Sequence, residues 1–385
     1  MGKWEMVRLG EVTNLTSGYA FDSKYFNEKS EGMPVIRIRD VLRGYTNTYT
    51  TEGYKDNFIV QKGDLLIGMD GEFNISPWNS ENALLNQRVC KLESVSHILE
   101  NRYMFYFLPK VLRDIEEATS FVTVKHLSSK SINNIDIPLP PLDVQRKIAD
   151  VLDFANNLIE KRKAQIEKLD LLVKSQFMIE FGKCDSEANL SDYVWFQEGP
   201  GVRTIDFTIE GTILLTGSNI NKNQINFGSK RDRYISYELA NGKYKHFMCD
   251  KGDILVVSSA IDPDKFDSKV VIVHEDKRYC LNTGIIRFKP NSEYLTIAYF
   301  REFLKTNFFK SQVMNSMRGI AQMHFGPSHL NTMKIIVPSS IEQQTQFSDF
   351  VSQVEAQKSR LQQSLTKLEE NYKSLMQKCF RGEIF

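Results

Sequence analysis

Few residues of this chain have types and spacing that could do chemistry on their own. Asp264 follows a proline, and Glu275 and Lys277 come shortly after it. Some metal-dependent nucleases use two acids and a lysine of this kind to hold Mg²⁺ and orient a water. The pattern is permissive and has no equivalent in the first half of the chain, and a charged hairpin beside the apolar strand 270–273 accounts for it better. A self-contained metal-dependent nuclease using Asp264, Glu275 and Lys277 therefore stands as an alternative function.

Other catalytic and metal-binding patterns are missing from the sequence. His324 and His329 flank a Phe-Gly-Pro sequence, which favours a loop over a helical metal site. Neither a glycine-rich dinucleotide motif, nor a nucleotide-hydrolysing loop, nor an Asn/Asp-Pro-Pro-Tyr methyltransferase motif occurs. The five cysteines are far apart and form no Cys-x-x-Cys pair, so we expect reduced thiols. We predict no catalytic residue, no metal and no cofactor in this chain.

The composition is that of an ordinary folded protein, with 41% hydrophobic and 25% charged residues. No apolar run is long enough to span a bilayer, and residues 1–10 lack the apolar stretch of a signal peptide. We therefore expect a cytoplasmic protein without membrane contact. The formal net charge of +1 is low for an autonomous DNA-binding protein, so any basic surface must be local.

Internal repetition organises the 385 residues. An opening segment at 7–12 matches one at 188–193, and each leads to a glycine-containing turn. The sequence KGDLLI at 62–67 matches KGDILV at 251–256. Each is a polar turn followed by an apolar strand. Polar loops at 85–89 and 281–285 correspond next, followed by the helix openings at 142–148 and 341–347. The order is preserved, which indicates two copies of one unit.

Each copy begins with short β-type segments rich in Ile, Val, Tyr and Phe and includes one apolar helical stretch, at 98–115 or 294–317. A proline-marked connector at 137–141 or 336–338 then leads into a long helix. The predicted domains are 1–141 and 184–339, with a central helix at 142–183 and a C-terminal helix at 340–385. The predicted fold class is α+β.

Both long helices carry apolar residues in steps of three and four, which is typical of a coiled-coil seam. Arg162 and Lys358 interrupt the two seams at different layers, as residues that specify register do. Pairing of the two helices with each other is the simplest hypothesis. The predicted seam residues are Ile148, Leu152, Ala155, Ile159, Ile166, Leu169 and Val173 in the first helix, and Phe347, Val351, Val354, Leu361, Leu365, Leu368 and Tyr372 in the second.

The helix length suggests a spacing role. A helix over 143–181 would be roughly 58 Å long at 1.5 Å per residue, more than the about 34 to 36 Å of one turn of B-DNA. Two like domains held by such helices could reach two separate sites on one duplex.

These features together resemble the specificity subunits of type I restriction-modification systems. The resemblance rests on PLPPLDVQ at 138–145, its partner VPSSIEQQ at 337–344, the two Lys-Gly-Asp turns, and LNQR at 85–88, and it covers nearly the whole chain. It implies two pseudo-repeated α/β target-recognition domains separated by two long helices that form an antiparallel coiled coil. The second copy departs from the pattern, with Ser339-Ser340 in its connector and Asn282-Thr283-Gly284 in its polar loop.

The resemblance also implies a function. Each domain would bind half of a bipartite double-stranded DNA site, and the subunit itself would catalyse nothing. Two DNA methyltransferase (modification) subunits and the restriction/translocase subunits would assemble around it. S-adenosylmethionine for adenine-N6 methylation, and ATP and Mg²⁺ for restriction, would belong to those partners. Basic surfaces of the partners would supply much of the phosphate attraction, which fits the near-neutral charge of this chain.

Candidate DNA contacts are the polar side chains of loops, because arginine can bind guanine, and asparagine or glutamine can bind adenine, through two hydrogen bonds. In the first copy they are Tyr19, Arg37, Arg39, Asn86, Gln87, Arg88, Lys125 and His126. In the second copy they are Arg203, Ser218, Asn219, Ser258, Ser259, Asn282, Gln322 and His324. A third hypothesis is a coiled-coil scaffold without DNA specificity, which would not protect two half-sites on DNA.

Overall fold

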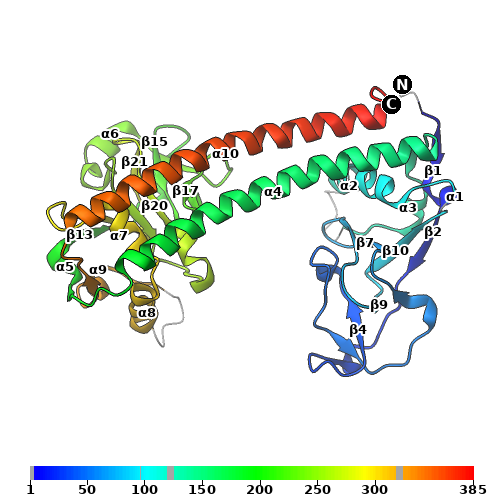
Figure 1. Cartoon of the computed structure of the whole chain (residues 1–385), viewed down its shortest axis with the longest axis horizontal. Coiled ribbons are helices and arrows are strands. Elements are labelled where there is room, and N and C mark those ends of the chain that lie inside the picture. Colours follow the sequence, from blue (N-terminus) through cyan, green and yellow to red (C-terminus); the bar gives the residue numbers. More distant parts are fainter. Residues whose placement is uncertain (1–3, 96, 119–124, 318–323) are drawn as a thin grey trace. The chain divides into compact units, whose positions relative to one another are not determined.

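The computed structural model describes residues 4–95, 97–118, 125–317 and 324–385 of the chain. The chain divides into two compact units, Met1–Ala164 with Gln363–Phe385, and Gln165–Gln362. The division cuts both long helices in the middle, because each unit packs its own segment of each helix. We call residues 4–141 head 1 and residues 184–339 head 2 (Figure 1).

Head 1 contains two sheets that share a core cluster. The first has the strand order β2-β10-β7-β8 and the second β3-β5-β4-β9-β6. The strands of the first sheet are β2 (Thr13–Ser17), β7 (Leu65–Gly68), β8 (Ile75–Pro77) and β10 (Val89–Ser94). Those of the second are β3 (Phe26–Asn27), β4 (Met33–Ile36), β5 (Tyr49–Thr50), β6 (Ile59–Val60) and β9 (Ala83–Leu85). A strand pair and three helices complete head 1: β1 (Met6–Arg8), β11 (Asp136–Pro138), α1 (Leu9–Val12), α2 (Asn101–Ala118) and α3 (Ser129–Asn133).

Head 2 repeats this plan. Its first sheet has the order β13-β22-β19-β20 and its second β14-β18-β15-β21. The strands of the first sheet are β13 (Val194–Glu198), β19 (Ile254–Val257), β20 (Val270–Ile272) and β22 (Ile285–Pro290). Those of the second are β14 (Phe207–Thr208), β15 (Thr212–Leu215), β18 (Arg233–Ile235) and β21 (Tyr279–Leu281). The remaining elements are the pairs β12 (Glu187–Asn189) with β23 (Lys334–Ile336) and β16 (Ile220–Asn221) with β17 (Gln224–Ile225), and the helices α5 (Leu190–Tyr193), α6 (Tyr237–Asn241), α7 (Ile297–Phe303), α8 (Asn307–Ser316) and α9 (Pro327–Leu330).

The two heads share one strand order, except that β6 adds a fifth strand to the second sheet of head 1 and the pair β16 with β17 is added in head 2. In each, the first sheet is antiparallel, and the second contains one parallel pair, β4 with β9 or β15 with β21. The α+β fold class and the duplication expected from the sequence are therefore confirmed. The repeated apolar strands β7 and β19 are buried throughout, because their alternate residues face different layers. Leu65 packs toward the helices, for example, and Leu66 toward the second sheet.

The repeated Lys-Gly-Asp turn has a structural role in both heads. The Asp64 carboxylate accepts a hydrogen bond from the Gln61 backbone N–H at 2.8 Å, and Asp253 accepts one from Asp250 at 2.7 Å. Each carboxylate also pairs with a cation of the central strand of its first sheet. Lys91 lies 3.7 Å from Asp64, and Arg287 lies 3.3 Å from Asp253.

A buried glutamine joins each head to the start of a long helix. The side-chain amide of Gln145 donates to the carbonyls of Ile98 and Pro140 at 2.9 and 2.8 Å, and its oxygen accepts from the Glu100 N–H at 2.9 Å. In head 2, Gln344 likewise bonds the Tyr294 carbonyl at 2.9 Å and the Thr296 N–H at 3.0 Å. Both glutamines are fully buried.

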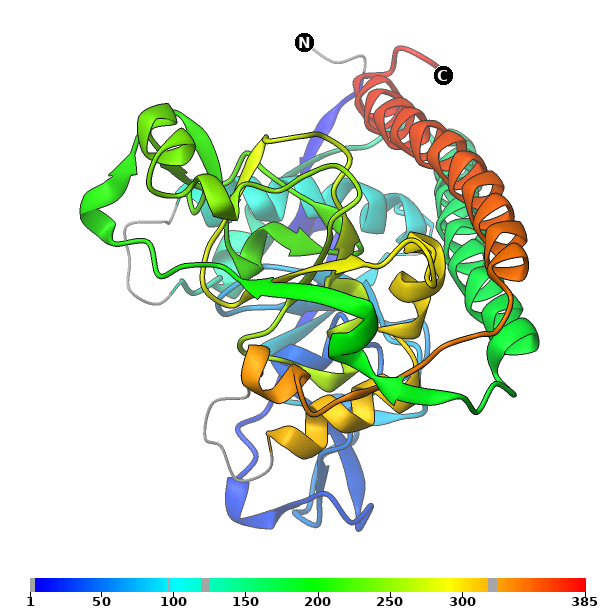
Figure 2. The ribbon, with the colours of Figure 1, turned by 90° about the vertical axis from the view of Figure 1, so that its left-hand side faces the viewer.

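The long helices are α4 (Leu142–Phe181) and α10 (Ile341–Arg381), where the sequence predicts helices over 142–183 and 340–385. In unit 1, Ile148 and Leu152 near the start of α4 share a core cluster with Tyr372 and Cys379 near the end of α10. In unit 2, the end of α4 packs against the start of α10 (Figure 2). The helices are therefore antiparallel. All the seam residues named above are buried or half-buried, and Lys358 forms an ion pair with Asp170 of α4.

One helix prediction was wrong. The stretch 294–317 forms two helices, α7 and α8, rather than one. Thr306 causes the break, because its hydroxyl accepts a hydrogen bond from the Phe309 N–H and so caps a new helix.

The cysteines are all free thiols, in agreement with the sequence. Burial raises the pKa of Cys90 and Cys280 to about 12, which makes both thiols poor nucleophiles at neutral pH. Among the described residues, no helix combines the length and the apolar character needed to cross a membrane.

The two Lys-Gly-Asp carboxylates should contribute unequally to stability. Asp253 is 2% exposed and Arg287 is 5% exposed, so Asp253→Ala leaves a buried guanidinium without its carboxylate and should cost about 3 to 5 kcal/mol. Asp64 is 22% exposed, and Asp64→Ala should cost about 1 kcal/mol. Urea unfolding followed by tryptophan fluorescence measures both losses. Equal losses would contradict this account of the turn.

Candidate nucleic-acid interface

In head 1, the polar residues chosen from the sequence gather at one end of the first sheet. Strand β2 ends there at Ser17, β7 ends at Gly68, and β10 begins at Val89. The backbone of Tyr19 pairs with Asn86, and that of His126 pairs with Asp70. Segments distant in the sequence thus meet at this end, which we call the loop end of head 1.

Asp70 organises the charged side chains of the loop end. Its Oδ2 lies 2.8 Å from Arg88 Nη1, and its Oδ1 lies 2.6 Å from His126 Nδ1. Asp70 is 21% exposed, whereas Arg88 and His126 are 54% and 51% exposed. A largely buried carboxylate therefore holds two exposed nitrogen-bearing groups.

Lys125, Tyr19 and Arg37 flank this cluster. Lys125 pairs with Glu116 at 2.9 Å, and this hydrogen bond lowers the pKa of the Glu116 carboxyl. The Tyr19 ring packs edge-on against Phe21 with 5.0 Å between the ring centres and leaves the tyrosine exposed. Arg37 follows β4 as Asn86 follows the parallel strand β9, so both lie at the same strand ends.

Arg39 and Gln87 complete the set chosen in head 1. Arg39 is half-exposed and lies 3.8 Å from Asp40, and the Gln87 backbone donates to the Tyr19 carbonyl at 2.9 Å. The structure thus brings together, within one head, residues that the sequence places between positions 19 and 126.

Head 2 has an equivalent loop end with different side chains. Ser259 pairs with His324 as Asp70 does with His126, and the Ser259 hydroxyl lies 2.9 Å from His324 Nδ1. His324 Nε2 lies 3.5 Å from Glu198 Oε1. The Asn282 side chain accepts a hydrogen bond from the Val202 N–H at 3.3 Å and so shapes its own loop.

The other residues chosen in head 2 differ in their availability. Arg203 lies in a loop and Ser218 in the short 3-10 helix Gly217–Asn219, and both are exposed. Asn219 is 3% exposed and Ser258 is fully buried, so neither presents its side chain at the surface. The Asn219 amide instead bonds the Asn226 carbonyl and Asp232, which gives it a structural role. Gln322 lies outside the described residues.

Sequence reasoning missed the two carboxylates, Asp70 and Glu198. Acidic side chains repel phosphates, so the sequence alone gives no reason to expect them at a DNA surface. The only signal available in the sequence is positional, because Asp70 follows β7 as Ser259 follows β19.

The nuclease alternative gains no support from the structure. Glu275 pairs with Arg278, and Lys277 pairs with Asp250, which together with Lys289 lowers the pKa of the Asp250 carboxyl to about 2. Within the described parts of the chain, no three His, Cys, Asp or Glu residues are grouped in a way that could hold a metal ion. His329, expected in a loop, lies in the short helix α9 and accepts a hydrogen bond from the Gly326 N–H.

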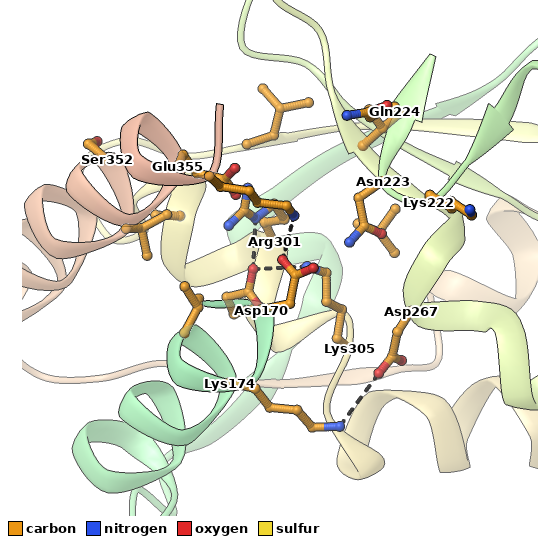
Figure 3. Close-up of a pocket in the computed structure, with 18 of the residues that line it drawn as sticks. Asp170, Lys174, Lys222, Asn223, Gln224, Asp267, Arg301, Lys305, Ser352 and Glu355 are labelled. Atoms are coloured by element: carbon orange, nitrogen blue, oxygen red, sulfur yellow. Dashed lines mark hydrogen bonds and ion pairs between the residues drawn. The ribbon is translucent and has the colours of Figure 1, made fainter. Parts of the chain in front are cut away.

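A cavity of about 1020 Å³ lies elsewhere in unit 2, between α4, α7 and α10 (Figure 3). Arg301 on its wall bonds Glu302 at 2.7 Å and Glu355 of α10 at 3.1 Å, and Lys305 bonds Glu302 at 3.0 Å. Burial lowers the pKa of Lys305. These ion pairs connect head 2 to α10, and we regard them as structural.

Comparison with known proteins identifies the family. The type I restriction modification DNA specificity domain matches residues 1–168 and again residues 200–370. The chain is 29% identical to the EcoBI specificity subunit of Escherichia coli, over 99% of this chain and 86% of that one. It is 25% identical to the MjaVIII specificity subunit of Methanocaldococcus jannaschii, over 88% of this chain and 83% of that one.

Solved structures show the same fold. The S subunit of a type I restriction-modification system from M. genitalium aligns with a TM-score of 0.54 at 14% identity, over 98% of this chain and 96% of that one. A chain from a structure of type I restriction-modification complex assembly aligns with a TM-score of 0.56 at 15% identity, over 100% of this chain and 98% of that one. The chain therefore belongs to the family of type I restriction-modification DNA specificity subunits, as its sequence motifs indicate.

Two glycines set the geometry of the loop ends and can be tested. A Cβ on Gly18 would lie 2.0 Å from the Asn86 carbonyl oxygen, and one on Gly199 would lie 2.2 Å from that of Asn282. Gly18→Ala and Gly199→Ala should each displace a polar loop and cost about 1 to 3 kcal/mol. Thermal unfolding, with amide hydrogen exchange at residues 85–89 and 281–285, measures the effect.

Gly53 and Gly201 are matched controls, since a Cβ at either meets nothing within 4 Å. Their alanine variants should unfold at the wild-type temperature. If Gly18→Ala and Gly199→Ala do the same, the close approach does not hold the loops.

Proposed function

We propose that this chain binds one bipartite site in double-stranded DNA, with the loop end of each head contacting one half. The observation that carries the proposal is the repetition of one backbone frame with different side chains. Asp70 and His126 in head 1 occupy the places of Ser259 and His324 in head 2. Two copies of one backbone arrangement that carry different polar side chains are suited to binding two different base sequences.

The candidate contacts in head 1 are better supported than those in head 2. Tyr19, Arg88, Lys125 and His126 present polar atoms at one surface, whereas Asn219 and Ser258 in head 2 are buried. In head 2 the proposal therefore rests chiefly on Ser259, Asn282 and His324, with Arg203 and Ser218 at its edge.

The proposed partners are two DNA methyltransferase subunits and the restriction/translocase subunits of a type I complex in the cytoplasm. This chain would select the site, and the partners would methylate adenine at N6 with S-adenosylmethionine and cleave DNA with ATP and Mg²⁺. The net charge of +1 supports this division of tasks, since a chain that bound DNA alone would need a larger basic excess.

The exposed face of α4 is the proposed docking surface for the methyltransferase. In unit 2 this helix exposes Leu171, Leu172, Met178 and Ile179, of which Ile179 is 74% exposed. Apolar side chains so exposed at a spacing of seven residues suit a helix of a partner protein.

Footprinting of a DNA duplex by the chain, with and without its methyltransferase partner, tests the proposal. We expect two protected half-sites separated by an unprotected gap, because each head contacts one half. A single continuous footprint, or protection independent of sequence, would favour a scaffold without DNA specificity. Cleavage of the duplex in Mg²⁺ by the chain alone, if abolished by Asp264→Ala, would contradict the non-catalytic role.

A further inference from the structure

The Arg88–Asp70–His126 cluster assigns a specific task to head 1. We propose that Arg88 recognises a guanine in the half-site of head 1, and that Asp70 is a positioning residue that holds the Arg88 guanidinium for this contact. The inference rests on the proposed function and deepens it, because it names the base and the residue that reads it.

The geometry leaves one edge of the guanidinium available. Arg88 uses Nη1 toward Asp70 Oδ2, and among the described residues no further partner of its side chain is found. Its other N–H groups can therefore form the paired hydrogen bonds with O6 and N7 of guanine that an arginine makes in the major groove. A guanidinium already fixed at one nitrogen loses less side-chain freedom on binding than a free one.

Charge argues for a base rather than a phosphate. The Asp70 carboxylate lies 2.8 Å from Arg88 and neutralises it, and His126 binds the other oxygen of the same carboxylate. Such a cluster gains little from a phosphate, because the attraction of the guanidinium is opposed by the adjacent carboxylate. The O6 and N7 acceptors of guanine carry only partial negative charge, so the carboxylate opposes hydrogen bonds to them much less.

The orientation of His126 follows from the same carboxylate. Since an ionised carboxylate only accepts hydrogen bonds, His126 donates from Nδ1. The His126 side chain is 51% exposed, so the ring stays accessible from outside. Asp70 thus fixes the direction of both side chains at once.

In head 2 the same backbone arrangement carries a different residue at the position of Arg88. The backbone N–H of Met69 donates to the Arg88 carbonyl at 3.0 Å, and that of Ser258 donates to the Gly284 carbonyl at 2.8 Å, so Gly284 occupies the place of Arg88. A Cβ on Gly284 would lie 2.7 Å from the Ser259 hydroxyl, at a backbone φ of +79°. An arginine is therefore strained at this position of head 2, and the Arg88–Asp70–His126 cluster belongs to head 1.

The test uses the full chain assembled with its methyltransferase partner and duplexes that carry the footprinted site. Each guanine is replaced in turn by 7-deazaguanine, which lacks the N7 acceptor, and the affinity of each duplex is measured by competition. For the wild type we expect one guanine in one half-site at which the replacement weakens binding about tenfold or more. Arg88→Ala should bind the unmodified duplex more weakly by a similar factor and should no longer distinguish 7-deazaguanine there.

Asp70 is tested by two substitutions. Asp70→Ala should reduce discrimination at the same guanine and leave the other half-site unchanged. Asp70→Asn keeps an acceptor for Arg88 and should restore part of the discrimination, which a purely structural role would not produce. Lys62→Ala, which removes the same charge from an exposed position before β7, at the end of that strand opposite the loop end, is the control and should bind as the wild type does.

Two results would overturn the inference while the bipartite footprint remains. One is an Arg88→Ala variant that weakens binding uniformly, with the 7-deazaguanine pattern intact and a smaller salt dependence, which is the behaviour of a phosphate contact. The other is an Asp70→Ala variant that discriminates as the wild type does. Loss of the footprint in the wild type would instead contradict the proposed function itself.

Discussion

The attachment of each head to its helix depends on one buried side chain, Gln145 in unit 1 and Gln344 in unit 2. Each amide satisfies backbone groups of the head at the point where a long helix begins. A buried amide left without these partners would be costly, so the bonds fix the direction in which the helix leaves the head. Tyr103 and Tyr299 reinforce the junction through hydrogen bonds to the connector carbonyls of Pro138 and Ile336. A DNA-recognition surface can contribute to binding of a bipartite site only if it is held rigidly in this way.

Duplication then explains how one chain can address two different sequences. The strand order of the first sheet, the parallel pair, the Lys-Gly-Asp turn and the glutamine junction are the same in both units, because they maintain the backbone arrangement. The side chains at the loop ends differ, because the backbone arrangement does not depend on them. The cluster carboxylate belongs to the segment after β7 in head 1, as Asp70, and to strand β13 in head 2, as Glu198. At the loop ends the side chains thus differ while the backbone arrangement that carries them is kept.

The sequence predicts the frame well and the loop-end contacts poorly, for a physical reason. Periodicity and turn residues are local, so the repeat, the buried strands and the starts of α4 and α10 follow from them. The partners of Asp70 come from residues 18 and 56 positions further along the chain, and no local pattern indicates that they meet. Asn219 shows the opposite error, since a polar residue in a loop suggested a DNA contact and proved to be a buried structural amide. The break between α7 and α8 was missed because a capping threonine is inconspicuous within an otherwise helical pattern.

The central claim is that two like heads, joined by paired helices, recognise two half-sites. The most direct measurement is sequencing of methylated adenines in host DNA, with the wild-type chain and with a variant that carries one extra heptad in each of α4 and α10. A whole heptad preserves the seam of the coiled coil, so the helices should still pair. This account predicts a two-part methylated sequence whose halves are identical in both cases and whose gap is longer in the variant. Altered halves with an unchanged gap would contradict it.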